Sequence, residues 1–210
     1  MSKKDAIRVL TSNGTGEIVE KKSRFIANTF YVDSVGDAED RIAAINKKYY
    51  DARHNCYAYV IGDNSEITKC SDNGEPSGTA GKPILEVITG AGLTNILVVV
   101  TRYFGGVLLG TGGLVRAYTQ AAQAGIAASG VGEKVFGRLM TLTLDYAKIN
   151  SVQYYLGQKE INIRDSRYGA DVQFDIYVRE NDADKVKDDL IQKCEGQLDI
   201  QEIETGYFIL

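Results

Sequence analysis

The stretch Val98–Tyr118 allows few folds because it joins an apolar run to a glycine-rich turn and an alanine-rich segment. The run Ile96–Val100 is apolar at every position, which predicts a strand buried on both faces. After the turn, a helix is expected to begin close to Leu114. Glycine lets an anion approach backbone N–H groups, and a helix N-terminus favours negative charge. The stretch therefore predicts a strand–turn–helix unit that can hold a phosphate or a carboxylate.

Two arginines flank this turn. Arg102 precedes it, and Arg116 is expected in the first turn of the helix, where both could contact an anion. A Walker-type phosphate loop ends in Gly-Lys-Ser/Thr, so nucleotide hydrolysis by that mechanism is not expected. The glycines could instead serve close packing of the helix on the sheet. The two arginines favour anion binding over packing alone. The glycines of the turn are Gly105, Gly106, Gly112 and Gly113.

A second polar loop, Ser71–Pro83, ends where a helix over Ile84–Ile88 is expected. Gly78 and Gly81 could expose backbone donors, Thr79 could cap the helix, and Lys82 could meet a phosphate. An ordinary capped helix start explains the same residues. Two such loops in one domain favour a shared groove.

The same loop carries an acidic pair, Asp72 and Glu75. As an alternative role, these carboxylates could bind Mg²⁺ beside a phosphate or act as acid and base. Carboxylates in such loops more often stabilise a turn through hydrogen bonds to the backbone. Catalysis is therefore the secondary interpretation, and no catalytic residue is assigned.

Histidine and cysteine are too sparse for a metal centre. His54 is the single histidine, and the three cysteines lack the spacing of a structural zinc site, so neither a metal nor another cofactor is expected. We interpret His54 as a hydrogen-bonding residue at the start of a strand and Cys56 as a core residue. Arg53 and His54 could still line the groove.

Charge and glycine divide the 210 residues into two parts. Residues 1–132 carry 14 Lys+Arg and 13 Asp+Glu, whereas residues 133–210 carry 10 and 15; glycine divides 17 to 5. This asymmetry predicts two domains, 1–132 and 133–210, with the site in the first. No apolar run is long enough for a membrane span, no signal peptide is recognised, and the odd cysteine number fits reduced thiols, so a cytoplasmic protein is expected.

Hydrophobic periodicity predicts an α+β fold in both domains. In the first domain we expect a turn at Ser12–Gly16, strands at Arg24–Val32, Cys56–Ile61 and Ile67–Cys70, and a helix at Asp37–Tyr50. The second domain reads strand–helix–strand–strand–helix–strand, which is the order of a ferredoxin-like fold. Its expected elements are Arg138–Tyr146, Asn150–Glu160, Ile161–Arg167, Asp171–Arg179, Asp182–Cys194 and Gln197–Glu204.

The order and spacing of five motifs resemble the YigZ/Impact family. In chain order they are Ser23–Phe25 (SRF), His54–Cys56 (HNC), Ser71–Gly81 (SDNGEPSGTAG), Thr101–Gly106 (TRYFGG) and Gly110–Tyr118 (GTGGLVRAY). The resemblance implies a first domain folded like the second domain of a small-subunit ribosomal protein. It implies a ferredoxin-like second domain similar to a module of a translocation elongation factor.

The resemblance also implies a connection with translation. Eukaryotic relatives are regulators that compete for the activator of a starvation-responsive initiation-factor kinase. They carry an additional N-terminal binding domain that this chain is expected to lack. The leading hypothesis is a non-catalytic binding protein that contacts RNA or ribosome phosphates through its first domain. One alternative is an enzyme acting on a small phosphorylated or carboxylated metabolite. Another is an adaptor for a protein of the translation apparatus. The oligomeric state stays open.

Overall fold

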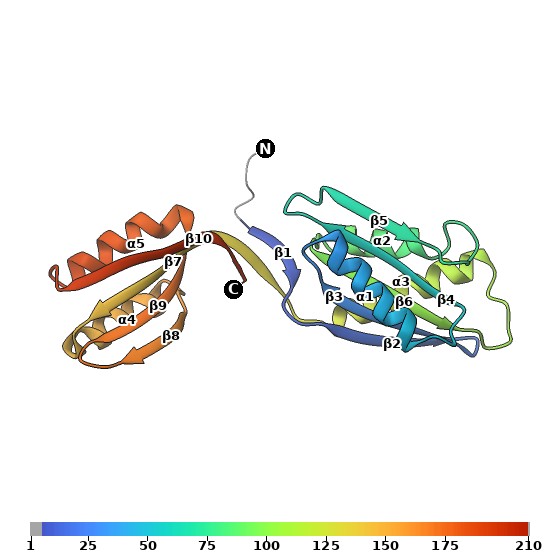
Figure 1. Cartoon of the computed structure of the whole chain (residues 1–210), viewed down its shortest axis with the longest axis horizontal. Helices are drawn as coiled ribbons and strands as arrows, with labels where there is room; N and C mark the ends of the chain where they lie inside the picture. The colour runs from blue at the N-terminus through green and yellow to red at the C-terminus, as the bar shows by residue number, and fades with distance from the viewer. Residues whose placement is uncertain (1–5, 210) are drawn as a thin grey trace. The chain divides into compact units, whose positions relative to one another are not determined.

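The computed structural model describes residues 6–209 and divides into two compact units, Met1–Glu133 and Lys134–Leu210. Figure 1 shows both units as mixed helix and strand, so the protein is of the α+β class. Strand β7 (Val131–Leu144) begins at the end of the first unit, and the chain enters the second unit within this strand. In the described residues, no helix combines the length and apolarity needed to cross a bilayer.

The first unit is built on an antiparallel sheet in the order β2-β3-β6-β4-β5. Its middle strand β6 is buried from Ile96 to Arg102, which confirms the strand expected from the apolar run. The bounds are β2 (Gly14–Glu20), β3 (Ser23–Tyr31), β4 (His54–Ile61), β5 (Ile67–Ser71) and β6 (Ile96–Tyr103). The short strand β1 (Ala6–Leu10) bridges to this unit through Arg8 and Leu93.

Helices cover both faces of this sheet (Figure 1). Helix α1 (Val35–Lys48) packs Ala38 and Ile45 on one face, as its periodicity predicts. Helices α2 (Gly81–Gly90) and α3 (Thr111–Ala127) pack on the other face. Because the buried side of α3 is rich in alanine, its backbone can lie close to β2 and β3.

The expected turn at Ser12–Gly16 is wrong in its second half, because β2 already begins at Gly14. A Cβ on Gly16 would overlap the backbone of Ala124 and Gly125 in α3. Gly16 is therefore needed for the close contact between β2 and α3, and it is not a turn residue as its sequence neighbours suggested.

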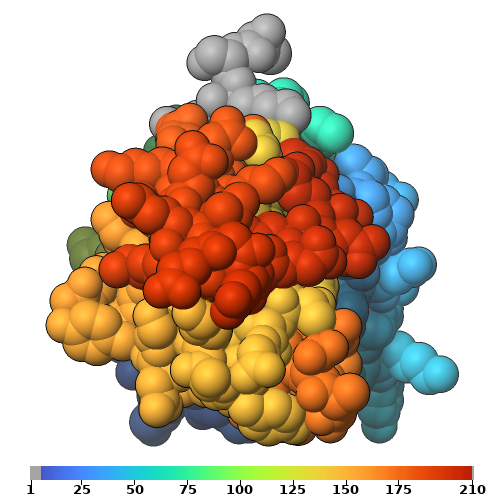
Figure 2. All heavy atoms as spheres, turned by 90° about the vertical axis from the view of Figure 1, so that its left-hand side faces the viewer, coloured from blue at the N-terminus to red at the C-terminus, as the bar shows by residue number. Residues whose placement is uncertain are grey.

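The second unit has a ferredoxin-like fold with the strand order β10-β7-β9-β8. Alternate residues of β9, from Val172 to Val178, are buried, as its strict alternation predicts. Helix α5 and strand β10 form the orange and red surface in Figure 2. The remaining bounds are α4 (Ile149–Gln158), β8 (Ile163–Tyr168), β9 (Val172–Arg179), α5 (Glu180–Lys193) and β10 (Leu198–Ile209), with a 3-10 turn at Tyr146–Lys148.

Candidate functional site

Residues from separate motifs meet at one edge of the first sheet, where β6 ends and β3 and β4 begin. Strand β4 begins where β6 ends, so His54 is the register partner of Arg102. Strand β3 begins at the same edge, where Arg24 pairs with Tyr103. Helix α2 begins against the end of β5, because Gly81 lies close to the backbone of Ser71. The loop after β6 then leads into α3.

A buried ion pair holds the centre of this edge. Nη1 of Arg102 donates to Oε1 of Glu75 over 2.6 Å, and the two side chains are only 8% and 3% exposed. The hydroxyl of Tyr118 donates to the same oxygen over 2.9 Å. Within the described residues, Nε of Arg102 has no acceptor. The charge of Arg102 is thus neutralised inside the protein and serves to fix the loop that carries Glu75.

Cys56 and His54 hold the same loop from β4. The thiol of Cys56 donates to the carbonyl of Asp72 over 2.9 Å. Burial raises the pKa of Cys56 to about 12, so the thiol stays protonated and is a poor nucleophile. Nδ1 of His54 lies 2.9 Å from the carbonyl oxygen of Asn73, which can only accept, so Nδ1 carries the proton. Both residues match the interpretation of a core cysteine and a hydrogen-bonding histidine.

Asp72 caps helix α2. Its Oδ1 accepts from the backbone N–H groups of Ala80 and Gly81, and its Oδ2 accepts from Gly78, all over 2.8–2.9 Å. The expectation that Thr79 caps this helix is wrong, because the Thr79 hydroxyl donates to the carbonyl of Pro76. A charged carboxylate suits the helix dipole better than a hydroxyl does. The donors expected to receive an external anion here are used by the protein's own side chain.

Removing this cap is expected to destabilise the protein in a pH-dependent way. Burial opposes ionisation of Asp72, but the three backbone hydrogen bonds outweigh it and hold the pKa of the carboxyl below its usual value. A carboxyl whose pKa is lower in the folded state stabilises that state at pH values above its unfolded pKa of about 4. This stabilisation is lost as the pH falls through the folded pKa. Asp72→Ala should therefore lower the free energy of unfolding by about 1 kcal/mol at pH 7.

Urea unfolding of the wild type and Asp72→Ala between pH 7 and pH 3 tests this prediction. The difference between the two should shrink steadily below about pH 4. Asp72→Asn is the control, since it keeps an acceptor without a titrating charge. A difference that stays constant over the whole pH range would show that the ionised cap is not what stabilises the loop.

The glycines of the loop after β6 have different roles. The N–H of Gly105 donates to the Ser23 hydroxyl, and a Cβ there would overlap the backbone of Lys22 and Ser23. Gly106 has a φ of 84°, which favours glycine. A Cβ on Gly113 would lie 2.9 Å from the Cβ of Leu109. At Gly112 a Cβ would meet only Nη1 of Arg116, at 3.9 Å. Gly106 and Gly112 are therefore the two of these four that have open space around them, and Gly112 is the one that lies beside Arg116.

The start of α3 is open, in contrast to that of α2. Gly110 is the N-cap residue, no side chain caps the helix, and its first turn has no acidic residue. Because α3 begins at Thr111, before the expected start near Leu114, Arg116 lies in the second turn and not in the first. Glycines are tolerated at a helix start, where the first N–H groups have no intrahelical partner. Arg116 is exposed beside this start.

The other predicted cations lie on the surface. Arg53 is exposed just before β4, and Lys82 is exposed in the first turn of α2 with its Nζ 4.0 Å from Oε1 of Glu86. The two carboxylates proposed as an alternative acid–base or Mg²⁺ pair have internal partners, as described above. Within residues 6–209, His, Cys, Asp and Glu side chains form no group of three or more that could hold a metal ion.

One group of exposed apolar side chains was not predicted from the sequence. Phe104, Val107 and Leu108 are 56%, 43% and 83% exposed in the loop between β6 and α3. The sequence did contain a signal, because Phe104 lies directly before the first glycine pair and Val107 and Leu108 lie between the two pairs, where no periodicity would bury them. Exposed apolar side chains grouped on a loop are typical of a contact surface.

The fold is thus that of a two-domain α+β protein. Of its two glycine-rich helix starts, that of α2 is capped by the carboxylate of Asp72, and that of α3 has no side-chain cap. Residues 21–126 match the Impact N-terminal domain, and residues 142–197 match a domain of unknown function, DUF1949. The chain is 40% identical over 194 residues to IMPACT family member YvyE of Bacillus subtilis (strain 168), covering 92% of this chain and 89% of that protein. The chain belongs to the IMPACT family.

Further relatives agree with this assignment. IMPACT family member YigZ of Escherichia coli (strain K12) is 40% identical over 152 residues, which cover 71% of this chain and 74% of that protein. A solved structure titled "Crystal structure of an hypothetical protein" is similar over 96% of this chain and 98% of its own, with a TM-score of 0.62 and 33% identity. The similarity therefore extends over both units.

Proposed function

We propose that the protein is a cytoplasmic, non-catalytic RNA-binding protein linked to translation, which contacts RNA or ribosome phosphates through the start of α3. The observation that carries this proposal is the contrast between the two helix starts. The N–H groups of α2 are occupied by Asp72, whereas those of α3 have no side-chain cap and stand beside the exposed Arg116. The helix dipole and unpaired N–H groups favour a phosphate there.

The geometry around Gly112 supports the proposal. A Cβ at this position would stand 3.9 Å from the guanidinium of Arg116, so a group approaching the Gly112 backbone comes within reach of that charge. Lys21 and Lys22 are exposed on the turn that Gly105 contacts, so this turn adds positive charge beside the loop that leads into α3. The exposed ring of Phe104 follows β6 and offers a surface for stacking a base.

Fluorescence anisotropy with a short labelled single-stranded RNA, at several salt concentrations, tests the proposal. Arg116→Ala should weaken binding and reduce the slope of log affinity against log salt by about 0.7, the value for one phosphate contact on a single strand. Gly112→Ala should weaken binding without unfolding the protein. Arg41→Ala is the matched control, since it removes an exposed arginine on α1, across the sheet from α3. Equal effects of Arg116→Ala and Arg41→Ala, or no binding by the wild type, would refute the proposal.

A second candidate function is a contact with a protein of the translation apparatus, and the exposed group Phe104, Val107 and Leu108 favours it. Co-sedimentation with purified ribosomes separates the two candidates. Loss of co-sedimentation with Leu108→Ser, together with no change in Arg116→Ala, would favour the protein contact. The reverse pattern would favour the phosphate contact.

A further inference from the structure

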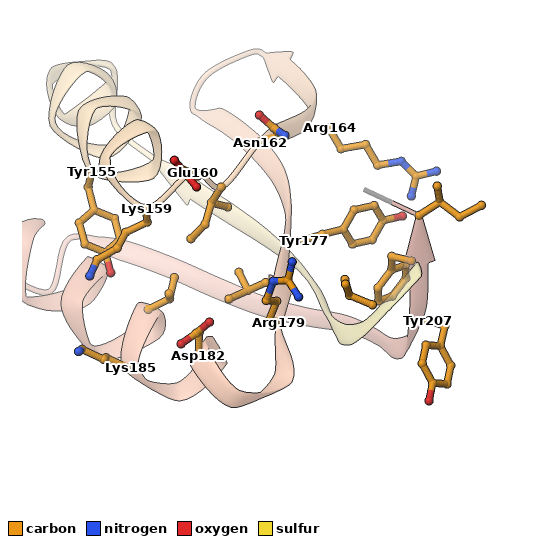
Figure 3. A pocket seen from close by; sticks show the side chains of 16 residues that line it. Tyr155, Lys159, Glu160, Asn162, Arg164, Tyr177, Arg179, Asp182, Lys185 and Tyr207 are labelled. Atoms are coloured by element: carbon orange, nitrogen blue, oxygen red, sulfur yellow. The ribbon is translucent and has the colours of Figure 1, made fainter. Parts of the chain in front are cut away.

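A cavity of about 700 Å³ lies within the second unit, and no residue of the five sequence motifs lines it. Its wall comes from the end of α4 and the following loop, the first residues of β7 and β8, the end of β9, the start of α5 and the end of β10. Pockets of 300–1,000 Å³ are of the size that accepts a small organic ligand. Figure 3 shows the side chains that line it.

The charge of this wall is opposite to that of the unit around it. Residues 134–210 carry 10 Lys+Arg and 14 Asp+Glu. The described lining, in contrast, has more basic than acidic side chains: Lys159, Arg164, Arg179 and Lys185 against Glu160 and Asp182. Such a concentration of positive charge in an acidic unit favours an anionic ligand over a cationic one.

The two ends of the cavity differ in chemistry. Figure 3 shows Lys159 and Lys185 near Tyr155 at one end. Both lysines are exposed, and within the described part of the chain neither forms an ion pair. Their ammonium groups are therefore available to an acidic group of a ligand.

The other end is aromatic. The ring of Tyr177 stacks on Phe208 with centroids 4.1 Å apart and planes 25° apart. The guanidinium of Arg164 lies 4.9 Å from the centroid of Tyr177, and Tyr207 stands on the same side (Figure 3). Rings and a guanidinium plane together favour a flat aromatic group.

We propose that this cavity binds an organic anion that carries a flat aromatic ring, of about the size of a mononucleotide. The ring packs at the end formed by Tyr177 and Phe208, and the anionic group meets Lys159 and Lys185. A ligand with only one of these parts would use only one end of the cavity. The site lies in the second unit, so it does not depend on the phosphate contact proposed for α3.

Isothermal titration calorimetry of the full chain with AMP tests this proposal. AMP supplies both parts, adenosine supplies the ring alone, and ribose 5-phosphate supplies the anion alone. We expect AMP to bind at least about tenfold more tightly than either fragment. Equal affinity for AMP and ribose 5-phosphate would show that the ring makes no contact and would overturn the proposal, as would no binding of AMP at millimolar concentration.

Variants then locate the binding. The double change Lys159→Ala with Lys185→Ala should weaken AMP binding by about tenfold or more, and Tyr177→Ser should weaken it as well. Lys187→Ala is the matched control on α5, because Lys187 pairs with Glu202 and does not line the cavity. A loss of AMP binding in Lys187→Ala equal to that in the double variant would overturn the proposal. A loss in Arg116→Ala with none in the double variant would do the same, since it would place AMP at α3.

Discussion

Replacing Arg102 with alanine is expected to lower the free energy of unfolding by about 3–5 kcal/mol, which is a large part of the stability of a typical domain. The change removes the only charged partner that the structure shows for Glu75, whose side chain is 3% exposed. A buried carboxylate without a partner keeps its desolvation cost and loses its compensating attraction. The Tyr118 hydroxyl would remain as a neutral donor.

A matched ion pair on the surface of the same unit provides the control. Nε of Arg24 also lies 2.6 Å from a carboxylate oxygen, that of Glu17, but its side chain is 53% exposed. Arg24→Ala should therefore change stability far less, because water replaces the lost partner. Urea unfolding of both variants, followed by circular dichroism, measures the difference. Equal losses in Arg102→Ala and Arg24→Ala would show that burial does not determine the value of these pairs.

The double variant Arg102→Leu with Glu75→Leu tests the same reasoning by removing both charges of the pair. If the loss in Arg102→Ala comes from stranding a buried charge, removing both charges should be less damaging than removing Arg102 alone. The orphaned Nε of Arg102 would also disappear. A double variant as unstable as the single one would indicate that the arginine acts mainly through its packing against Phe25 and Phe104.

The second large effect is expected for Gly105→Ala, which should lower the free energy of unfolding by about 3 kcal/mol. The added Cβ would overlap backbone atoms of Lys22 and Ser23, and backbone cannot move aside as the end of a flexible side chain can. The turn between β2 and β3 or the end of β6 would have to shift. Thermal and urea unfolding measure the loss.

Gly112→Ala, seven residues later, is the control for this prediction. The new methyl group would meet open space apart from Arg116, and alanine is the better helix former, so stability should rise by up to about 1 kcal/mol. The same variant should lose RNA affinity if the open start of α3 binds phosphate. Similar stability losses in both variants would show that Gly112, too, is needed for packing.

Much of the fold could be predicted from local patterns. The apolar run of β6, the alternation in β9 and the spacing of apolar residues in α1 each reflect a period that burial imposes on a single element. Boundaries were less accurate: α3 begins at Thr111 and not near Leu114, and β10 continues to Ile209 and not only to Glu204. Glycines at a helix start and exposed strand ends carry little periodic signal.

The motifs indicated a candidate site, but they did not indicate the roles that its residues have in the structure. Arg102 was expected to face an anion and instead pairs with Glu75. The cap of α2 comes from Asp72 and not from Thr79, although Thr79 stands next to the helix start. The cavity of the second unit had no sequence signal at all, because its lining comes from segments that are far apart in the chain.

The sequence by itself determined the elements and the α+β class, because these follow from patterns within short segments. Only the tertiary structure decided which charges are used internally and which helix start stays open. Arg102 and Glu75 are 27 positions apart, and Asp72 reaches donors six to nine residues ahead. Such pairings depend on distance and burial, which exist only once the strands and loops have been brought together.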